Sequence, residues 1–351
     1  MGLAACLDVS VCPQRSRSRA STLSAGLSAL FAWLALAASA PAVAQTKVVL
    51  GTAKDPNLGS QLVIAREKGY FKEAGLDAEI KFFPSGGDLV AAFVGGSVHM
   101  GSSGATPVTI LRARPYPIEI VAQISDNSGA QQLIVKQNIR SLDELAGKKI
   151  ALMRGTGSEA LFNAIANAYG FDPAKAELIN MGPSEMVQAF ARGSVDAISV
   201  WEPNCTFARK TGNGKVLVSA TQSFIPGKEG MRRVHGEHAI LFSSQAFVRS
   251  QPNTVRAVLT ALLKATDFIE KNRTEAIAIL GKEFSLEPAD MTDVLAGNHY
   301  TLALDGQLVA DLDKLSDFLV GLKRFPAPVR ATDWIEPGPL RALRPDLVNL
   351  R

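Results

Sequence analysis

The fold of this chain is decided by the stretch from Gly147 to Asn204. It reads GKKIALMRGTGSEALFNAIANAYGF over residues 147–171 and AELINMGPSEMVQAFARGSVDAISVWEPN over residues 176–204. An apolar strand at 150–153 stops at a glycine turn, residues 154–158, and a helical pattern follows at once. The first turn of a helix has unpaired backbone N–H groups. The stretch therefore predicts a place for an anionic or strongly polar group at the turn.

Length and composition indicate a globular protein of two lobes. The chain has 351 residues, 47% of them hydrophobic and 20% charged, which is too long for one small core. Its formal charge is +4, and the first 44 residues, with three arginines and one aspartate, account for half of it. The rest of the chain carries little net charge, so there is no electrostatic case for binding nucleic acid.

The first 44 residues are typical of an export signal. A basic stretch at 15–19 precedes an apolar run at 27–38, and Ala42-Val43-Ala44 is a small-residue cleavage site before Gln45. The alternative is a membrane anchor, but the apolar run has only about a dozen residues, against roughly 20 needed to span a bilayer. We expect a periplasmic protein that begins at Gln45.

The cysteines indicate neither a disulfide nor a catalytic thiol in the mature chain. Of Cys6, Cys12 and Cys205, only Cys205 remains after cleavage at Gln45, so no intramolecular disulfide can form. Cys205 follows a Trp-Glu-Pro-Asn turn on an apolar helix face. We interpret it as a buried, inert thiol rather than a nucleophile.

An internal repeat is the most informative feature of the chain. Residues 88–99 (DLVAAFVGGSVH) match residues 185–196 (EMVQAFARGSVD), with Val, Ala, Phe, Gly, Ser and Val all displaced by 97 positions. Each copy follows an Ala-Glu strand and a Pro-Ser turn, and each leads into a short strand that ends in a polar loop. The two halves therefore repeat one β-turn-α-β unit.

Such units have a defined geometry. A strand, crossover helix and parallel strand form a right-handed connection, which sends every loop of this kind to the carboxyl edge of its sheet. We expect Phe93 and Phe190 to be core residues and two lobes to face each other across a cleft. Function is then expected in the loops at the strand ends.

Further patterns predict the remaining strands and helices. Strands are predicted at 47–51, 78–83, 98–102, 118–124, 132–136, 215–220 and 239–242, a helix at 58–70, and amphipathic helices at 251–269, 273–284, 288–297 and 306–323. Ser141 and Glu144 suggest a capping box. His235-Gly-Glu-His238 could be a metal site, but it lies in a polar loop at 221–237, and we interpret it as a solvated loop near a hinge.

These motifs carry a family resemblance. The exported start, YFKEAGLDAEIKFFPSGGDLVAAFVGGSVHMG (70–101), LDELAGKKIALMRGTGSE (142–159) and FARGSVDAISVWEP (190–203) together resemble the nitrate/sulfonate/taurine family of ABC-transporter substrate-binding proteins. The resemblance covers the mature chain in order. It implies an α/β fold of the type II periplasmic binding-protein kind, with two α/β lobes, a hinge and a ligand cleft between lobes. It places lobe 1 at 45–127 plus 240–351 and an inserted lobe 2 at 128–239.

The resemblance also implies where the ligand is held. Carried over by motif, the ligand-binding candidates are loop residues and helix starts: Lys54, Asp55, Asn57, Ser85, Gly86, Ser102, Ser103, Ala105, Thr106, Arg154, Gly155, Thr156, Gly157, Ser158, Trp201 and Glu202. Sulfonate-type relatives commonly show Trp-Asp-Pro where this chain has Trp-Glu-Pro.

Each of these ligand-binding candidates could instead have a purely structural role. Residues 156–158 could cradle a sulfonate or merely cap a helix. Arg154 could pair with the ligand or with a nearby acid, and Trp201 could be a cleft wall or a core residue. The glycine turn has no lysine of the kind found in nucleotide-binding loops.

Three functions remain open at this point. The first is the solute-binding component of an ABC importer, a monomer without cofactor or metal. It would capture a small organic anion, of the aliphatic sulfonate or taurine type, by lobe closure and deliver it to a membrane permease that an ATPase drives. A neutral pyrimidine or thiamine precursor, or an aromatic carboxylate, is the alternative ligand. An enzyme on the same cleft is second, since a pyrimidine-forming relative exists, and a sensor domain is third.

Overall fold

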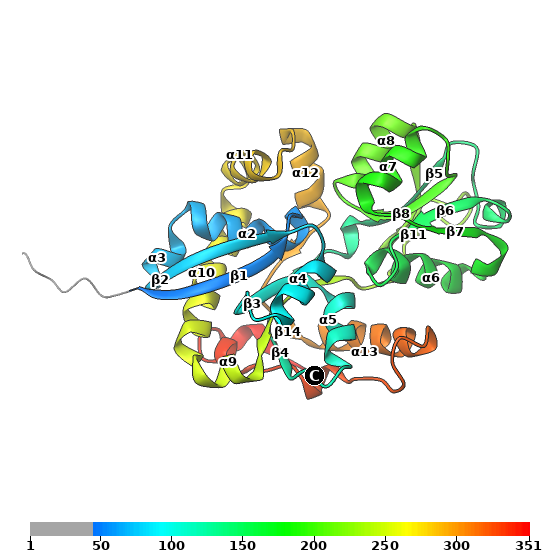
Figure 1. The fold of residues 1–351 in the computed structure, drawn as a ribbon. Helices are drawn as coiled ribbons and strands as arrows, with labels where there is room; N and C mark the ends of the chain where they lie inside the picture. The colour runs from blue at the N-terminus through cyan, green and yellow to red at the C-terminus, as the bar shows by residue number, and fades with distance from the viewer. Residues whose placement is uncertain (1–44) are drawn as a thin grey trace, which may run out of the picture. The chain divides into compact units, whose positions relative to one another are not determined.

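The computed structural model describes residues 45–351. The predicted signal peptide and its cleavage site fall on residues 1–44, outside the described residues. The chain from residue 45 onward forms two α/β lobes, each built on one sheet (Figure 1). No helix in this part of the chain is long and apolar enough to cross a membrane.

The first lobe is built on a six-stranded sheet. Its strands lie in the order β2, β1, β3, β12, β4, β13. Strands β1, β2 and β3 are parallel, whereas β12 runs antiparallel to both of its neighbours. The strands are β1 (Thr46–Ala53), β2 (Leu76–Phe83), β3 (Met100–Gly104), β4 (Ile118–Asp126), β12 (His238–Ser244) and β13 (His299–Tyr300).

Helices cover this sheet and share one hydrophobic core with it. They are α2 (Pro56–Glu67), α3 (Tyr70–Glu73), α4 (Gly86–Val94), α5 (Ala105–Arg112), α9 (Gln245–Ser250), α10 (Pro252–Lys271), α11 (Arg273–Phe284), α12 (Pro288–Ala296), α13 (Gly306–Gly321) and α14 (Gly338–Arg341). Two short strands, β14 (Leu304–Asp305) and β15 (Val348–Asn349), pair near the end of the chain. In α10 the apolar positions recur at helical spacing, and that face is buried.

The second lobe is built on a seven-stranded sheet in the order β7, β6, β8, β5, β9, β10, β11. Apolar clusters lie on both of its faces, one under α6 and the other under α7 and α8. The elements are β5 (Gln131–Lys136), β6 (Lys149–Leu152), α6 (Gly157–Tyr169), β7 (Glu177–Asn180), α7 (Pro183–Ala191), β8 (Ala197–Trp201), α8 (Asn204–Gly212), β9 (Gly214–Ser219), β10 (Gln222–Ser223) and β11 (Gly230–Met231).

The internal repeat corresponds to equivalent structure in the two lobes. The unit β2-α4-β3 in the first lobe matches β7-α7-β8 in the second, and both units lie at the parallel part of their sheet. Phe93 and Phe190 are buried. Gly96 and Gly193, just after the two helices, have φ angles of 75° and 73°, a left-handed conformation that glycine adopts readily. The offset of 97 residues thus marks a repeated supersecondary unit.

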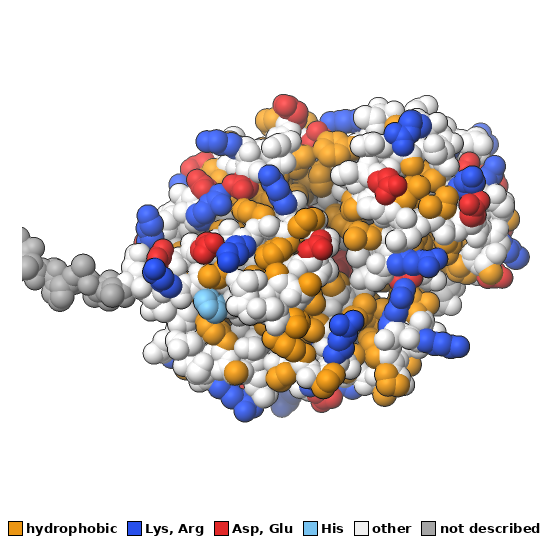
Figure 2. Space-filling view, viewed as in Figure 1, with side chains coloured by type: hydrophobic (Ala, Val, Ile, Leu, Met, Phe, Trp, Pro, Cys, Tyr) orange, Lys and Arg blue, Asp and Glu red, His pale blue; other side chains and the backbone are white. Residues whose placement is uncertain are grey.

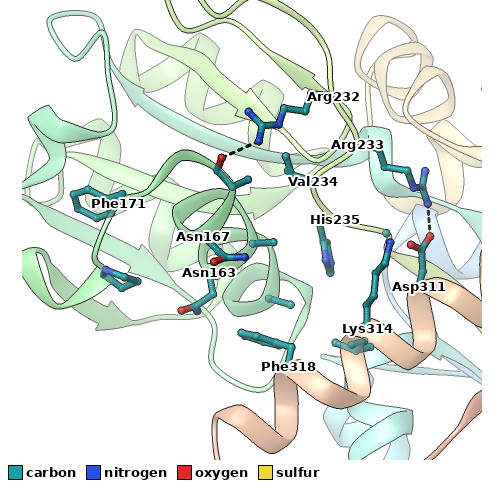
Figure 3. A pocket seen from close by; sticks show the side chains of 16 residues that line it. Asn163, Asn167, Phe171, Arg232, Arg233, Val234, His235, Asp311, Lys314 and Phe318 are labelled. Atoms are coloured by element: carbon teal, nitrogen blue, oxygen red, sulfur yellow. Dashed lines mark hydrogen bonds and ion pairs between the residues drawn. The ribbon is translucent and has the colours of Figure 1, made fainter.

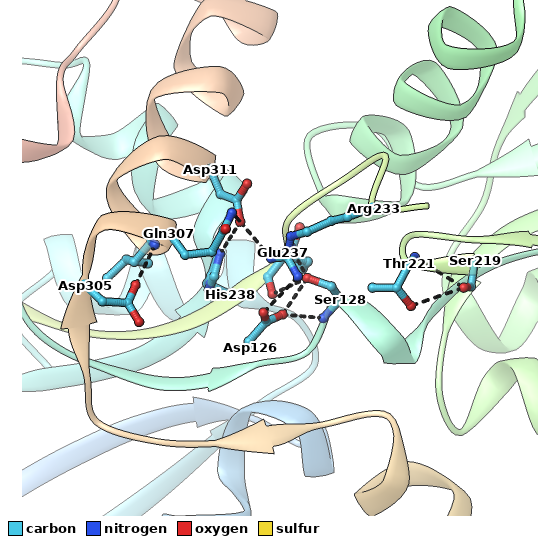
Figure 4. Close-up of polar contacts among 11 residues, drawn as sticks. Asp126, Ser128, Ser219, Thr221, Arg233, Glu237, His238, Asp305, Gln307 and Asp311 are labelled. Atoms are coloured by element: carbon cyan, nitrogen blue, oxygen red, sulfur yellow. Dashed lines mark hydrogen bonds and ion pairs between the residues drawn. The ribbon is translucent and has the colours of Figure 1, made fainter. Parts of the chain in front are cut away.

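Two chain segments, residues 127–130 and 232–237, cross between the sheets. Polar contacts fasten them to each other. Asn127 N donates to Glu237 O at 3.0 Å, and Glu237 N donates to Ser128 Oγ at 2.9 Å (Figure 4). Arg233 forms ion pairs with Asp126 at 3.0 Å and with Asp311 at 2.7 Å. These contacts define a hinge of two crossing segments.

Three local expectations need correction. The predicted helix at 58–70 begins at Pro56 and ends at Glu67, and α3 follows separately. Ser141 does not cap a helix, since residues 143–145 form a single 3₁₀ turn without a side-chain cap, and Glu144 accepts from the Arg140 backbone instead.

The third correction concerns the two histidines of the 235–238 segment, which is not a solvated loop. His238 is buried, with Nε2 at 3.0 Å from Asp311. The His235 ring is also almost fully enclosed and lies 3.1 Å from the carboxylate of Glu237.

Candidate functional site

A small space, here called the inner cavity, lies where the two lobes meet the hinge. Its volume is about 60 Å³. The first lobe contributes the start of α2 and the starts of α4 and α5, and the second contributes the start of α6 and the end of β8. Asn127, Gln131 and Glu237 complete the wall from the hinge. The inner cavity therefore lies at the carboxyl ends of parallel strands in both sheets, as the topology predicts.

A second space, here called the outer cleft, adjoins the inner cavity. Its volume is about 330 Å³, and the two spaces share Asp55, Leu58, Gly86, Thr156 and Trp201 as lining. Lys54, Ser85 and Ser184 line only the outer cleft. The space-filling view shows the surface hollowed along the boundary between the lobes (Figure 2). Together the two spaces form one cleft between the lobes.

Asp55 and Trp201 join the lobes directly across this cleft. Trp201 Nε1 donates to Asp55 Oδ2 at 2.6 Å. Asp55 also caps α2, because its Oδ1 accepts from the backbone N of Asn57 at 2.8 Å. Burial raises the pKa of Asp55 to about 6 in spite of these hydrogen bonds. An acid with a raised pKa at a cleft between lobes is typical of a functional site.

Asn57 is hydrogen-bonded to Asp55 and connects the two lobes. Its Nδ2 donates to the backbone oxygen of Glu202 at 2.7 Å, and its Oδ1 accepts from Asn298 at 2.8 Å. The side chain is buried and does not line either space. It holds the end of β8 against the first lobe.

The glycine turn of the second lobe is only partly directed at the cleft. Thr156 caps α6 and lines both spaces, and Gly157 lines the inner cavity. The Ser158 hydroxyl donates to Ser199 O at 2.6 Å inside the lobe. Arg154 is exposed, and neither it nor Gly155 lines the inner cavity or the outer cleft. The structure thus brings two of the five turn residues to the cleft.

A side chain of the protein itself lies in front of the predicted anion cradle. A Cβ atom added to Gly157 would come within 2.5 Å of Glu237 Oε2, and one added to Gly104 would come within 3.0 Å of Glu237 Oε1. Glu237 is buried, and its carboxylate therefore sits at the starts of both α5 and α6. A negative charge is stabilised at such positions. Sequence reasoning considered Glu237 only as part of the 235–238 segment and not as a residue of the cleft; the two glycines that make room for it were the available signal.

The first-lobe candidates divide in the same way. Ser85 caps α4 and lines the outer cleft with Lys54, and Gly86 lines both spaces. Ser102 donates to Leu58 O at 2.6 Å and fastens β3 to α2. Ser103, Ala105 and Thr106 are buried next to the cavity wall without lining it.

Glu202 and Cys205 face into the second lobe. The Glu202 carboxylate accepts from Thr206 N at 2.9 Å and lies 3.4 Å from Arg209. Burial raises its pKa. Cys205 is fully buried, as predicted, and burial raises the pKa of its thiol as well. Neither side chain lines the cleft, so both make their contacts inside the second lobe.

Two amides of the hinge, also missed from the sequence, have unused hydrogen-bonding capacity. Asn127 Oδ1 and Gln131 Oε1 are buried, and neither has a hydrogen-bond partner among the described residues. Both side chains line the inner cavity and are only 3% exposed. A buried acceptor without a partner is costly.

A larger groove lies between α6 and α13, beside the hinge (Figure 3). Its volume is about 710 Å³, and residues 232–236 form part of its wall. Its arginines already have partners: Arg233 pairs with Asp311, and Arg232 donates to Ala168 O at 2.8 Å. In the part of the chain that the structure covers, no group of three or more His, Cys, Asp or Glu is arranged to hold a metal.

Comparisons with known proteins agree with this architecture. The NMT1/THI5-like family profile matches residues 59–276. A binding protein of Brucella abortus (strain 2308) is 26% identical over 278 residues, covering 77% of this chain and 84% of the relative. The taurine-binding periplasmic protein of Escherichia coli (strain K12) is 24% identical over 277 residues, covering 76% and 84%.

Solved structures show the same fold. The alkanesulfonate-binding protein SsuA from Xanthomonas axonopodis pv. citri, bound to MOPS, superposes with a TM-score of 0.70 at 21% identity, covering 83% of this chain and 98% of that one. The desulfurization enzyme DSZB superposes with a TM-score of 0.62 at 15% identity, covering 85% and 98%. Binding proteins and an enzyme thus share this architecture.

Two lobes, a hinge of two crossing segments and a cleft at the strand ends define the type II periplasmic binding-protein fold. The chain belongs to the NMT1/THI5-like family, and its relatives include taurine-binding and alkanesulfonate-binding proteins. The family resemblance and the fold class predicted from the sequence are confirmed.

Proposed function

We propose that this protein is the periplasmic receptor of an ABC importer for a small organic anion of the aliphatic sulfonate or taurine type. The observation that carries the proposal is the outer cleft, which combines a lysine with several helix starts at the junction of the lobes. The names of the relatives, which include a taurine-binding and an alkanesulfonate-binding protein, point to the same chemistry.

The outer cleft has the features of an anion site. It is lined by Lys54, by the starts of α4 and α7 at Ser85 and Ser184, and by Thr156 at the start of α6. Backbone N–H groups and the helix dipole favour negative charge there, by about 0.3–1 kcal/mol for each helix. The ammonium group of Lys54 adds a full positive charge, so the anion of a sulfonate would be held from both lobes.

Capture would proceed by lobe closure about the hinge, with the lobes as bounded by residues 45–127 plus 240–351 and 128–239. The contacts that join the lobes support this step. Trp201 donates to Asp55, Asn57 donates to Glu202 O, and Arg324 Nη2 donates to both carboxylate oxygens of Glu159, at 3.0 and 2.9 Å. A solute bound between the lobes would add to the contacts that hold them together.

The closed form would then dock to a membrane permease, which an ATPase drives. The protein would act as a monomer. Residues 1–44 would direct its export to the periplasm and would then be removed. N-terminal sequencing of the exported protein tests the cleavage site. A mature chain that begins elsewhere than Gln45 would contradict it.

A solute panel tests the receptor role. We expect taurine and short alkanesulfonates to raise the melting temperature of the purified protein, and calorimetry to give a dissociation constant at or below the micromolar range. Trp201→Ala removes a wall of both spaces and the bond to Asp55, so it should abolish the shift. Phe224→Ala, at a side chain that is 44% exposed in the second lobe, is the control.

The outcomes distinguish the ligand from the role. If only neutral pyrimidines or aromatic carboxylates stabilise the protein, the sulfonate assignment is wrong and the receptor role stands. If a panel compound is converted to product by the purified protein, the receptor role itself is wrong and the cleft is an active site.

A further inference from the structure

Glu237 is a buried carboxylate at the junction of the two lobes. Its side chain is 4% exposed, and it lines the inner cavity. Among the described residues, the only hydrogen bond to this carboxylate is the contact between His235 Nε2 and Oε2, at 3.1 Å. No lysine or arginine of residues 45–351 lines the cavity. Burying a carboxylate is costly unless its charge is compensated, so Glu237 needs another source of compensation.

Two helix starts, one from each lobe, supply that compensation. A Cβ atom added to Gly104, at the start of α5, would come within 3.0 Å of Oε1, and one added to Gly157, at the start of α6, within 2.5 Å of Oε2. Because both residues are glycines, the carboxylate can approach the backbone closely. The starts of helices carry partial positive charge. Each carboxylate oxygen of Glu237 therefore lies at the positive end of a helix.

The start of α5 has no cap or anion of its own. Gly104 provides no side-chain cap, and the first turn of α5 contains no acidic residue. The other helix starts at the inner cavity are capped by their own side chains: Asp55 caps α2, Ser85 caps α4 and Thr156 caps α6. Glu237 thus brings from the hinge the negative charge that the start of α5 lacks.

The backbone at Glu237 is held on both sides. Its N–H donates to Ser128 Oγ at 2.9 Å, and its carbonyl oxygen accepts from Asn127 N at 3.0 Å. Glu237 and Ser128 lie together in the hinge (Figure 4). The hinge therefore presents the carboxylate to both lobes from a fixed position, which lowers the entropic cost of bringing the lobes together around it.

We infer that Glu237 is a tethered anion that occupies the helix starts at the inner cavity and thereby sets the charge preference of this part of the cleft. Its carboxylate stands where an anionic group of a solute would otherwise be held. Its fixed negative charge then excludes a second anion from the inner cavity. Glu237 is therefore a specificity-determining residue. This last consequence rests on the proposed receptor function, and it leaves the outer cleft, beside Lys54, as the place for the anion of the solute.

The size of the inner cavity makes the exclusion strong. A volume of about 60 Å³ would hold any bound anion close to Glu237 and to Asp55, which lines the same space. Like charges brought together in a place with little water repel strongly. The helix starts do not offset this repulsion, because the carboxylate of Glu237 already compensates their positive charge. A solute with anionic groups at both ends should therefore be rejected.

Chemical rescue tests the tethered anion without any solute. Glu237→Ala removes a carboxymethyl group, which has the same non-hydrogen atoms as acetate. Its melting temperature should fall by several degrees, and ~50 mM acetate should restore roughly half of the loss, because an anion that binds only the folded form stabilises it. Acetamide, which has the shape of acetate without its charge, should restore nothing. Wild type and Glu229→Ala, changed at an exposed glutamate between β10 and β11, are the controls and should show no acetate-specific shift.

Matched solutes test the charge preference by calorimetry. Ethanesulfonate and ethane-1,2-disulfonate differ in the second anionic group. Wild type should bind ethanesulfonate at least about tenfold more tightly, because the second sulfonate would meet the charge of Glu237. Glu237→Gln keeps the shape of the side chain and removes its charge, so the preference should fall several-fold. Circular dichroism verifies that each variant is folded.

The outcomes separate this inference from the proposed function. Rescue of Glu237→Ala by acetate and not by acetamide supports the tethered anion even if no sulfonate binds and the sulfonate assignment is wrong. Equal rescue by both compounds, or no rescue of the folded variant, would overturn it, because the side chain would then only fill space. Disulfonate bound by wild type as tightly as ethanesulfonate would overturn the charge preference. If the alanine variant does not fold, Glu237→Gln decides, and a melting temperature equal to that of wild type would refute the tethered anion.

Discussion

The two copies of the β-turn-α-β unit show which positions build the scaffold and which make the site. Scaffold positions agree: Phe93 and Phe190 are buried, and Gly96 and Gly193 adopt the same left-handed conformation. Positions at the cleft differ, since Gly104 of the first copy corresponds to Trp201 of the second. The repeat has kept the interior and changed the loop ends, so each lobe brings different chemistry to one cleft.

The helix caps beside the two units show the same contrast. Asp55 caps α2 in the first lobe, and Thr156 caps α6 in the second. The first lobe therefore brings a carboxylate to the cleft, whereas the second brings an uncharged cap and an aromatic ring. Predictions about equivalent residues of the two lobes can test how far the equivalence extends.

The largest effect is expected for the buried phenylalanines. Phe93→Ala and Phe190→Ala should each lower the free energy of unfolding by about 3–5 kcal/mol, because each leaves a cavity in a packed core. Phe93 packs against Phe242 with ring centroids 4.8 Å apart, and the Phe190 ring lies 4.0 Å from the Lys136 ammonium. Urea unfolding measures both. Val94→Ala, 46% exposed, is the control, and a cost below 1 kcal/mol for either phenylalanine would refute equal core roles.

A pH-dependent difference separates the two caps. The pKa of Asp55 is raised to about 6, so the stability that its neutral form confers is fully present below about pH 4 and is lost as the pH rises to about 6. Wild type should thus lose roughly 2 kcal/mol relative to Asp55→Asn between pH 4 and pH 7. Thermal unfolding across this range measures the difference. Thr156→Asn serves as the comparison, and its effect should not vary with pH; a flat profile for Asp55→Asn would contradict the prediction.

A smaller and symmetrical effect is expected at the glycines that follow the repeated helices. Gly96→Ala and Gly193→Ala should each cost about 1–2 kcal/mol, since alanine is strained at positive φ. An added Cβ meets no atom within 4 Å at either position, so the cost comes from the backbone alone. Chemical denaturation gives the two values. A difference above 1 kcal/mol between them would show that the copies are not equivalent.

The smallest effect is expected at the serines that fasten β3 and β8 to the first helix of their lobe. Ser102 donates to Leu58 O at 2.6 Å, and Ser199 donates to Ser158 O at 2.8 Å. Ser102→Ala and Ser199→Ala should each lower stability by about 1 kcal/mol, the net value of one hydrogen bond. Ser194→Ala, at an exposed position, is the control. No change in Ser199→Ala would mean that its bond is not needed for stability.

Much of the fold could be predicted from the sequence because its signals are local. Alternating and helical apolar patterns placed the strands and helices, and the repeat predicted the equivalence of the two units. The boundaries failed where no local pattern existed, as at Gly69, whose left-handed backbone separates α2 from α3.

From the sequence, the site could be placed in a set of loops, but the individual side chains that line it could not be predicted. Which side chains of those loops reach the cleft depends on hydrogen bonds made elsewhere, as when Ser158 turns inward to Ser199. Glu237 is about 80 residues from Gly157 in sequence, and the crossing of the hinge segments brings the two together. A local sequence pattern cannot specify that Glu237 contacts Gly157. Glycine at the starts of both α5 and α6 does indicate that another group packs closely against these two positions.

The place of β12 in the first sheet has a consequence for biosynthesis. The sheet of the second lobe has its last strand by residue 231, but β3 and β4 are joined only when residues 238–244 insert between them. During synthesis or export from the N-terminus, the sheet of the first lobe therefore cannot be completed until the second lobe has emerged. The lobe that begins the chain is the one that finishes folding last.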